Sequence, residues 1–119
     1  RGESPGMRYI RLRARLQEVR TAYPDLAAVF YEQAHHRGGA ATEYAVGCVA
    51  TVQAWCAEHG IEHSAVHSAT IKKHATGKGN AGKGEVIAAM RAAGFKPSDD
   101  NEADALALLA WALDQGGVQ

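Results

Sequence analysis

Apolar residues recur at close to helical spacing between Met7 and Val19, with arginines between them. This pattern predicts an amphipathic helix. The YPDL stretch that follows is expected to end the helix, because proline disfavours helical geometry in the residue before it. Six apolar residues and then an acid make up Leu26–Glu32 (LAAVFYE). A short continuous apolar run with β-branched and aromatic members is typical of a strand buried on both faces.

The pattern beyond this strand predicts a second strand and several helices. A long helix is expected over Thr42–Glu58, after a loop at Arg37–Ala40, with Thr42 as its cap and Gly60 at its end. Further along we expect a weak strand at Ile61–Val66, a short helix in SATIKKHAT, a glycine and lysine loop at Gly77–Gly84, and helices at Glu85–Ala93 and Asp100–Leu113.

The order strand, long helix, strand indicates a right-handed βαβ unit and therefore an α/β fold. Two parallel strands alone make a poor sheet, because a parallel sheet needs both of its faces covered. We therefore expect further strands, either upstream of Arg1 in a longer gene or in a partner chain. The length of 119 residues suits one domain. We expect that domain to span residues 1–119 and to be incomplete at its N-terminus.

Composition adds little about function. The chain is 46% hydrophobic and 22% charged, which is ordinary for a soluble globular protein, and its formal net charge is zero. The strongly basic balance of many nucleic-acid-binding proteins is absent, although arginines crowd the N-terminal fifth and local fields still matter. Cys48 and Cys56 lack zinc-site spacing and are expected to be reduced and buried. We see no membrane-length apolar run and no signal peptide, so a cytoplasmic protein is expected.

The stretch SDDNEADALALLAWALDQ sets a group of acids against an apolar segment. Asp99 and Glu102 fit a capping box at the start of the last helix. Asp104 is not explained by capping, since every other residue from Ala103 to Leu113 is apolar. A helix that is hydrophobic all round is buried, and a buried carboxylate needs a partner or a metal ion. Helical spacing places Asp104 on the same side of the helix as Asp100 and Asn101.

Glu32 is the second candidate acid, because it ends the most strand-like run of the chain. In open α/β sheets the ligand site lies at the carboxyl ends of the strands, so Glu32 is placed as a catalytic acid would be. The alternative is an exposed strand terminus without a role. His35 and His36 follow closely and could reach such a site, but a pair of histidines there is more simply a polar loop.

The GKGNAGKG stretch superficially matches a phosphate-binding loop through Gly77, Gly82 and Lys83. A nucleotide-hydrolysing loop requires Ser or Thr in the next position to hold magnesium, and Gly84 stands there. We interpret the stretch as a mobile basic loop whose lysines and backbone amides meet nucleic-acid phosphates. A solvated loop without a partner remains the alternative.

Taken together, these pieces resemble a known family. The order strand-Glu, long helix, weak strand, TGKGNAGKGEVIAAMRAAGF and then D-x-x-x-D-A-L-A-L is similar to the RuvC-type Holliday-junction resolvases of the RNase H-like superfamily, and within them to the phage-associated members. The likeness covers about Met7 to Leu113. Its two most specific motifs are a loop and a helix segment. The loop motif consists of Thr76, Gly77, Gly79, Ala81 and Lys83, and the helix motif is the final D-A-L-A, here Asp104–Ala107.

The resemblance implies a Mg²⁺- or Mn²⁺-dependent endonuclease with a two-metal site that acts on branched double-stranded DNA in a bacterial or phage-infected cell. It matches Glu32 and Asp104 to the family's second and last acids. The family's usual acid three residues before the last is Asn101 here, and Asp100 can substitute for it. Four lysines match the positions that contact DNA in the family: Lys72, Lys73, Lys78 and Lys83. The family also implies a two-fold homodimer, which the helix at 42–58 could form.

One departure bears on activity. The first acid of the family lies on an N-terminal strand, and nothing before Glu32 in this chain matches that strand. We therefore expect weak or no nuclease activity from this chain alone, and metal-dependent cleavage once an upstream strand carrying an aspartate is present. The alternative function is a non-catalytic DNA-binding or assembly module that keeps the RNase H-like fold. A third possibility is an unrelated small α/β domain whose acids only cap helices.

Overall fold

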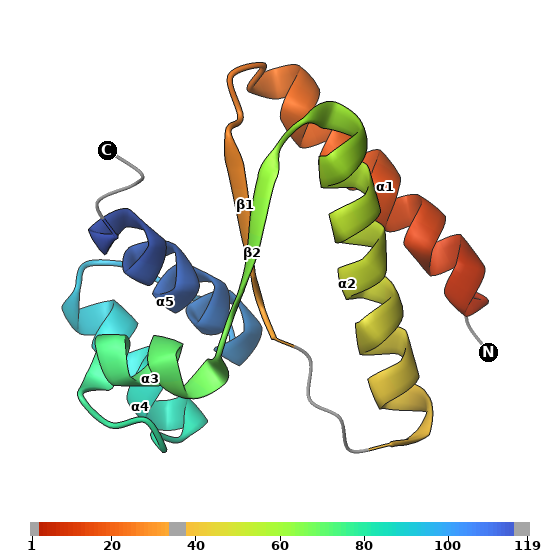
Figure 1. The fold of residues 1–119 in the computed structure, drawn as a ribbon. Helices are drawn as coiled ribbons and strands as arrows, with labels where there is room; N and C mark the ends of the chain where they lie inside the picture. The colour runs from red at the N-terminus through yellow and green to blue at the C-terminus, as the bar shows by residue number, and fades with distance from the viewer. Residues whose placement is uncertain (1–2, 34–37, 116–119) are drawn as a thin grey trace. The chain divides into compact units, whose positions relative to one another are not determined.

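A computed structural model describes residues 3–33 and 38–115 of the chain (Figure 1). The elements follow in the order α1 (Pro5–Ala22), β1 (Ala28–Glu32), α2 (Gly39–His59), β2 (Glu62–Val66), α3 (Ser68–Thr76), α4 (Lys83–Ala92) and α5 (Asp100–Asp114). The predicted alternation of strands and helices is confirmed. His35, His36 and Arg37, which sequence reasoning placed in a loop, lie outside the described residues.

The strands β1 and β2 pair with each other in a two-stranded sheet. The Glu62 amide donates to the Ala27 carbonyl oxygen at 3.2 Å, and the Gln33 amide donates to the Val66 carbonyl oxygen at 2.9 Å. The bonded partners therefore advance in the same direction along both strands, which makes the pairing parallel. This confirms the βαβ connection through α2.

The chain divides into two compact units, and both strands contribute to each. The first unit contains α1, α2 and the strand residues up to Val29 and Ser64. The second contains the strand residues from Phe30 and Ala65 onward, together with α3, α4 and α5. All the acids and lysines singled out in the sequence belong to the second unit. The single domain expected over residues 1–119 stays a prediction.

In the first unit, α1 packs along α2. The Ser4 side chain caps α1 by accepting a hydrogen bond from the Met7 amide, and the helix ends at Tyr23. The Tyr9 ring stacks on the Tyr44 ring with centroids 5.5 Å apart. It also lies directly against Gly47, where an added Cβ would overlap the Tyr9 hydroxyl oxygen. Close approach of the two helices here therefore depends on a residue without a side chain.

The core of the first unit forms where the end of α2 turns into β2. Trp55, Cys56 and Ile61 are buried there, and Trp55 is only 1% exposed. Both cysteines are unpaired thiols, and Cys48 is half-buried where full burial was expected.

The start of α2 differs from the prediction. The helix begins at Gly39, its N-cap is Gly38, and Thr42 lies inside the first turn without capping it. Both glycines have positive φ angles, 79° and 85°, a region that side chains rarely adopt. The chain therefore turns into the helix before Thr42, while the predicted end at Gly60 is confirmed.

In the second unit, α3 and α4 pack against α5 and against each other. The buried residues of this core are Val66, Ile71, Ala81, Val86, Met90, Ala103 and Ala107. Small residues on one side of α5 allow the other helices to approach closely. The prediction that α5 is buried on all sides is wrong, because Leu109 and Leu113 are 48% and 54% exposed.

Two further expectations are corrected in detail. The strand β1 is half-buried from Ala28 to Tyr31 and exposed at Glu32, where burial on both faces was predicted. In the described structure β1 is an edge strand, because its sheet contains only β1 and β2. Helix α4 starts at Lys83 and not at Glu85, because the Glu85 carboxylate accepts a hydrogen bond from the Gly82 amide and fixes the first turn. Within the described residues, no helix is long and apolar enough to cross a membrane.

Candidate active site

An aromatic contact ties the end of β1 to α5 in the second unit. The rings of Phe30 and Trp111 meet edge to face, with centroids 6.0 Å apart and planes at 78°. Alternate residues of a strand share a face, so Glu32 lies on the side of Phe30. Residues seven apart on a helix share a face, so Asp104 lies on the side of Trp111. The contact therefore brings the faces that carry the two acids together.

The electrostatics of Asp104 agree with this arrangement. Burial raises the pKa of the Asp104 carboxyl above its ordinary value, and the negative charges of Glu32 and Asp100 raise it further. The positive charges of Lys72 and Lys83 oppose that shift. Asp104 is half-buried and Glu32 is exposed. Residues from β1, α3, α4 and α5 thus act on one carboxyl group.

The N-terminus of α5 holds Asp100 in place. The Asp99 side chain caps the helix by accepting a hydrogen bond from the Glu102 amide at 2.8 Å, as predicted. Glu102 in turn accepts from the Ser98 amide at 2.6 Å, one residue earlier than an ordinary capping box. The cap fixes the first turn, in which Asp100 is the first residue.

Asp100 forms an ion pair with Lys83, whose Nζ lies 3.1 Å from the Asp100 Oδ2. This pair holds the pKa of the Asp100 carboxyl below its ordinary value. Asn101, the alternative third ligand, is exposed on the next position of the helix. Of the two candidates, Asp100 is therefore the one whose charge bears on Asp104.

A complete metal-binding group is not formed by these side chains. Among residues 3–33 and 38–115, no three His, Cys, Asp or Glu side chains are placed to hold one metal ion. Glu32, Asp100 and Asp104 influence one another through their charges, but Asp100 is paired with Lys83. The predicted ligands are thus gathered on one side of the unit without the closer approach that coordination requires.

The donor set still fits a hard divalent cation. Carboxylate oxygens are the ligands that Mg²⁺ and Mn²⁺ prefer. The negative charges of Glu32 and Asp100 raise the pKa of Asp104. A bound cation would reduce the repulsion among these three carboxylates. A bound ion there would supply activation of water and stabilisation of a leaving oxygen.

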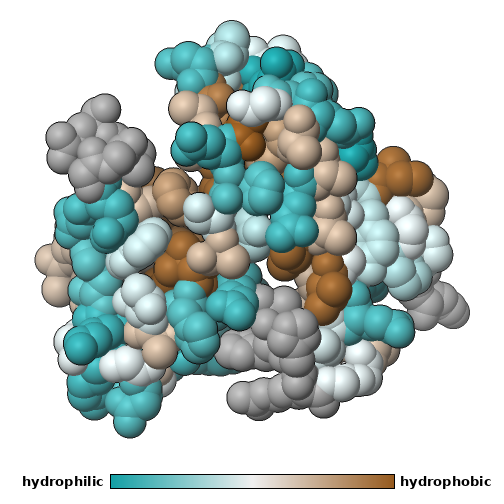
Figure 2. Space-filling view, viewed as in Figure 1, coloured by the Kyte–Doolittle hydropathy of each residue, from teal (hydrophilic) through white to brown (hydrophobic). Residues whose placement is uncertain are grey.

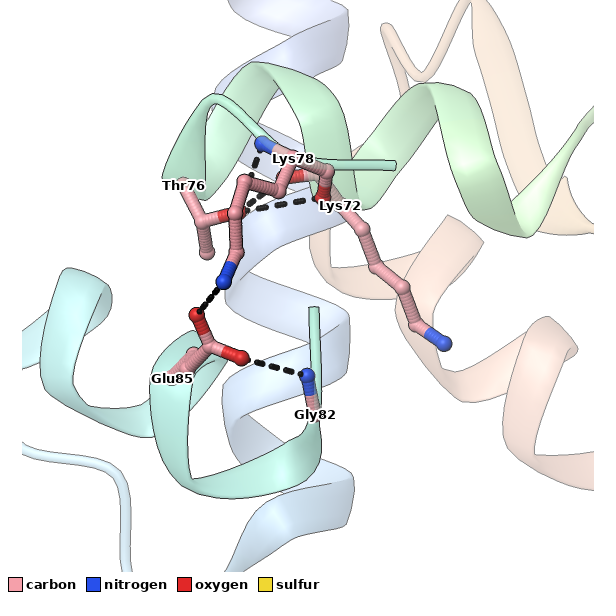
Figure 3. A network of polar contacts seen from close by, with 5 residues as sticks. All are labelled: Lys72, Thr76, Lys78, Gly82 and Glu85. Carbon is pink, nitrogen blue, oxygen red and sulfur yellow. Dashed lines mark hydrogen bonds and ion pairs between the residues drawn. The ribbon is translucent and has the colours of Figure 1, made fainter. Parts of the chain in front are cut away.

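The basic loop between α3 and α4 is held by a polar network that sequence reasoning missed (Figure 3). The Thr76 hydroxyl donates to the Lys72 carbonyl oxygen at 2.9 Å and accepts from the Lys78 amide at 3.1 Å. The Lys78 Nζ lies 2.8 Å from the Glu85 Oε2, while the Glu85 Oε1 accepts from the Gly82 amide. The loop is therefore anchored at both ends, and the G-x-x-E spacing of Gly82 and Glu85 was the signal for it.

The four candidate DNA-binding lysines differ in their surroundings. Lys78 is engaged by Glu85, and this pair holds the pKa of the Glu85 carboxyl below its ordinary value. Figure 3 shows the Lys72 side chain directed away from that network. Lys73 is exposed in the last turn of α3, and Lys83 opens α4. On the face shown in Figure 2, hydrophilic side chains dominate over α3 and α4.

Comparison with solved structures places the chain in a known family. RuvC from Thermus thermophilus in complex with a Holliday junction substrate is 30% identical, with a TM-score of 0.76; the match covers 98% of this chain and 73% of RuvC. A structure of RuvC from the same organism gives 26% identity, a TM-score of 0.70 and the same coverage. No family model and no curated protein sequence matches the chain.

These matches define the class of protein as an α/β nuclease with the RNase H-like fold. The chain belongs to the RuvC family of structure-selective Holliday-junction endonucleases. The predicted fold class and the predicted family are thereby confirmed. The phage-associated subgroup, the homodimer and the cytoplasmic location stay predictions.

Proposed function

We propose that this chain carries part of the active site of a metal-dependent endonuclease that cleaves phosphodiesters at Holliday junctions and other branched DNA. The observation that carries the proposal is the contact between Phe30 and Trp111, which joins the strand that bears Glu32 to the helix that bears the half-buried Asp104; the raised pKa of Asp104, to which the charge of Glu32 contributes, agrees with it. Capping explains neither residue. The similarity to RuvC bound to a Holliday junction substrate supports the choice of DNA as the partner.

In this proposal Glu32 and Asp104 are ligands of Mg²⁺ or Mn²⁺, and Asp100 joins them in a two-metal site. Asn101 is the alternative to Asp100. The carboxylates hold their positions because β1 and α5 are joined by the contact between Phe30 and Trp111. The oxygen-only donor set explains why hard cations are expected and zinc is not.

The lysines provide the proposed DNA contacts. Lys72 and Lys83 lie near enough to the acids to lower the Asp104 pKa, so a phosphate bound by them would lie beside the carboxylates. Lys73 and Lys78 extend the same basic segment. A two-fold homodimer would present two such sites to the symmetric arms of a junction.

Calorimetric titration with Mn²⁺ tests the metal site directly. We expect binding by the parent chain, and at least tenfold weaker binding by Asp104→Asn and by Glu32→Gln, since each change removes one charged ligand. Asp25→Asn, an exposed acid outside the site, is the control and leaves binding unchanged. Equal affinities in all four proteins would overturn the proposal.

Cleavage is tested with the natural gene product on a synthetic four-way junction with Mg²⁺ or Mn²⁺. We expect cleavage that is lost in Asp104→Asn and Glu32→Gln while junction binding remains. A product that stays inert with either metal contradicts the nuclease proposal.

A second function, DNA binding without cleavage, is favoured by one specific observation. The described residues contain no group of three metal-ligating side chains, and Asp100 is neutralised by Lys83. Junction binding that weakens steeply with salt, together with no Mn²⁺ binding and no cleavage, selects this function.

A further inference from the structure

The ion pair between Lys83 and Asp100 links the first residue of α4 to the first residue of α5. The Nζ to Oδ2 distance is 3.1 Å, while the two side chains are 79% and 33% exposed. Such an open pair contributes little to the stability of the fold. Its position is more informative, because it sets a positive charge on a carboxylate beside Asp104.

The other lysine pair of the same loop behaves differently. Glu85 uses one carboxylate oxygen for Lys78 and the other for the Gly82 amide at the start of α4. Release of Lys78 would therefore leave Glu85 in place as part of a helix cap. Backbone amides at the start of α5 also help to lower the Asp100 pKa, and release of Lys83 would leave the Asp100 Oδ2 without its ammonium partner.

We propose that Lys83 is an exchangeable counter-ion of the metal site. In the absence of DNA its ammonium group occupies Asp100; when a DNA phosphate arrives, Lys83 moves to the phosphate and leaves Asp100 free to bind a divalent cation. The inference rests on the proposed function. It adds a link between the binding of DNA and the binding of the divalent cation.

The physical basis is competition for one charged side chain. A lysine has a flexible four-carbon stem and a compact charge, so it can pair with a carboxylate or with a phosphate a few ångströms away. It cannot do both fully, and a cation at Asp100 is repelled by an ammonium group at the same oxygen. DNA and metal therefore help each other to bind, and linkage requires the effect to be equal in both directions.

The proposal has to be reconciled with the incomplete metal group. The acids are close enough to shift the pKa of Asp104, yet no three of them are placed to coordinate one ion within the part of the chain that the structure describes. Release of Lys83 removes the competing charge from Asp100, and coordination also requires the acids to approach one another more closely.

The first test is Mn²⁺ binding without DNA, measured by calorimetry on Lys83→Met and Lys83→Gln. Removal of the competing charge is expected to tighten binding by about two- to fivefold, the range that corresponds to an exposed ion pair. Lys96→Met, an exposed lysine in the same unit, is the control and leaves affinity unchanged. In an Asp100→Asn background, the Lys83 substitutions are expected to have a smaller effect, because only the repulsion between Lys83 and a cation at Asp104 then remains.

The second test measures the affinity for a four-way junction with and without Ca²⁺, which binds oxygen ligands. In the parent protein Ca²⁺ is expected to strengthen junction binding, and in Lys83→Met that strengthening is expected to fall by about two- to fivefold. A Lys83 variant that binds DNA less well but keeps the full Ca²⁺ effect overturns the inference.

The outcomes separate this inference from the proposed function. If Asp104→Asn abolishes Mn²⁺ binding but both Lys83 variants bind like the parent, the metal site stands and the counter-ion role is wrong. If the parent binds Mn²⁺ and a Lys83 variant binds it about two- to fivefold more tightly, the counter-ion role is supported. If neither binds Mn²⁺, both the metal site and the counter-ion role fail. Far-ultraviolet circular dichroism establishes that the Lys83 variants keep the helical content of the parent.

Discussion

Phe30 and Trp111 meet edge to face in the second unit, with ring centroids 6.0 Å apart. Neither ring is ionisable, yet the pair sets which face of β1 meets which face of α5. Glu32 follows Phe30 by two residues on the same face of the strand, and Asp104 precedes Trp111 by seven on the same face of the helix. The position of Glu32 relative to Asp104 therefore depends on this ring contact. The alignment of the acids can therefore be disturbed without touching an acid.

Trp111→Leu tests this dependence. We expect the free energy of unfolding to fall by about 1–3 kcal/mol, because the half-buried ring loses both apolar area and its aromatic partner. Mn²⁺ binding is expected to weaken although every carboxylate is retained. Urea denaturation and calorimetry measure the two effects. Leu113→Ala, at an exposed position of the same helix, is the control, and an equal loss in both variants would argue against a specific role for the ring contact.

The pKa of Asp104 predicts a pH dependence of stability in metal-free protein. Burial and the charges of Glu32 and Asp100 raise this pKa in the folded state, so the folded state binds the proton more tightly than the unfolded state. The stabilising effect of the proton is full below the unfolded value of about 3.9 and is lost as pH rises through the raised folded value. Asp104→Asn removes this contribution.

Urea denaturation of metal-free protein at a series of pH values measures this effect. Relative to Asp104→Asn, the parent protein is expected to lose stability as pH rises from about 4 through the raised pKa. Asp25→Asn, which changes an exposed acid, is expected to keep the dependence of the parent. Parallel curves for the parent and Asp104→Asn would rule out a proton-linked penalty at this residue.

The N-cap of α5 predicts a local effect on stability. Asp99→Ala removes the acceptor of the Glu102 amide hydrogen bond and is expected to cost about 1 kcal/mol in the free energy of unfolding. Ser98→Ala is the matched control, because the hydrogen bond between Ser98 and Glu102 uses the backbone amide of Ser98. Urea denaturation of the two variants compares them, and a larger loss for Ser98→Ala would show that the cap is wrongly assigned.

The lysines predict graded effects on junction binding. Lys72→Met and Lys83→Met are each expected to reduce the slope of log affinity against log salt concentration by about 0.9, as for one lost phosphate contact. Lys78→Met is expected to change the slope less, since Glu85 already neutralises that ammonium group. Fluorescence anisotropy with a labelled four-way junction measures the slopes. Lys96→Met serves as the control, and identical slopes in all variants would remove these lysines from the interface.

Much of the fold could be predicted from periodicity and from helix boundary residues. The apolar spacing of the first helix, the strand at Ala28–Glu32 and the end of α2 at Gly60 all agree with the structure. The start of α2 could not be predicted, because the residue pattern offers Thr42 as a cap while the backbone turns earlier at Gly38 and Gly39. The preference of threonine for the N-cap position does not decide where α2 begins. The positive φ angles of Gly38 and Gly39, which residues with side chains rarely adopt, decide it.

Exposure was less predictable than secondary structure. The apolar sequence of α5 indicated burial on all sides, but burial depends on how many elements surround a helix, and Leu109 and Leu113 remain exposed. For the site, the positions of Glu32 and Asp104 followed from strand ends and helix phase. The pairing of Lys83 with Asp100 could not be inferred, because it depends on how the starts of α4 and α5 meet in space.

The contact between Tyr9 and Gly47 has a consequence for related sequences. A methyl group at position 47 would overlap the Tyr9 hydroxyl, so a larger residue there requires a smaller one at position 9. The two positions are expected to covary among homologues that keep α1 against α2. A relative whose acids and lysines have diverged could then still be recognised as sharing this helix pairing, from two positions that carry no chemistry of their own.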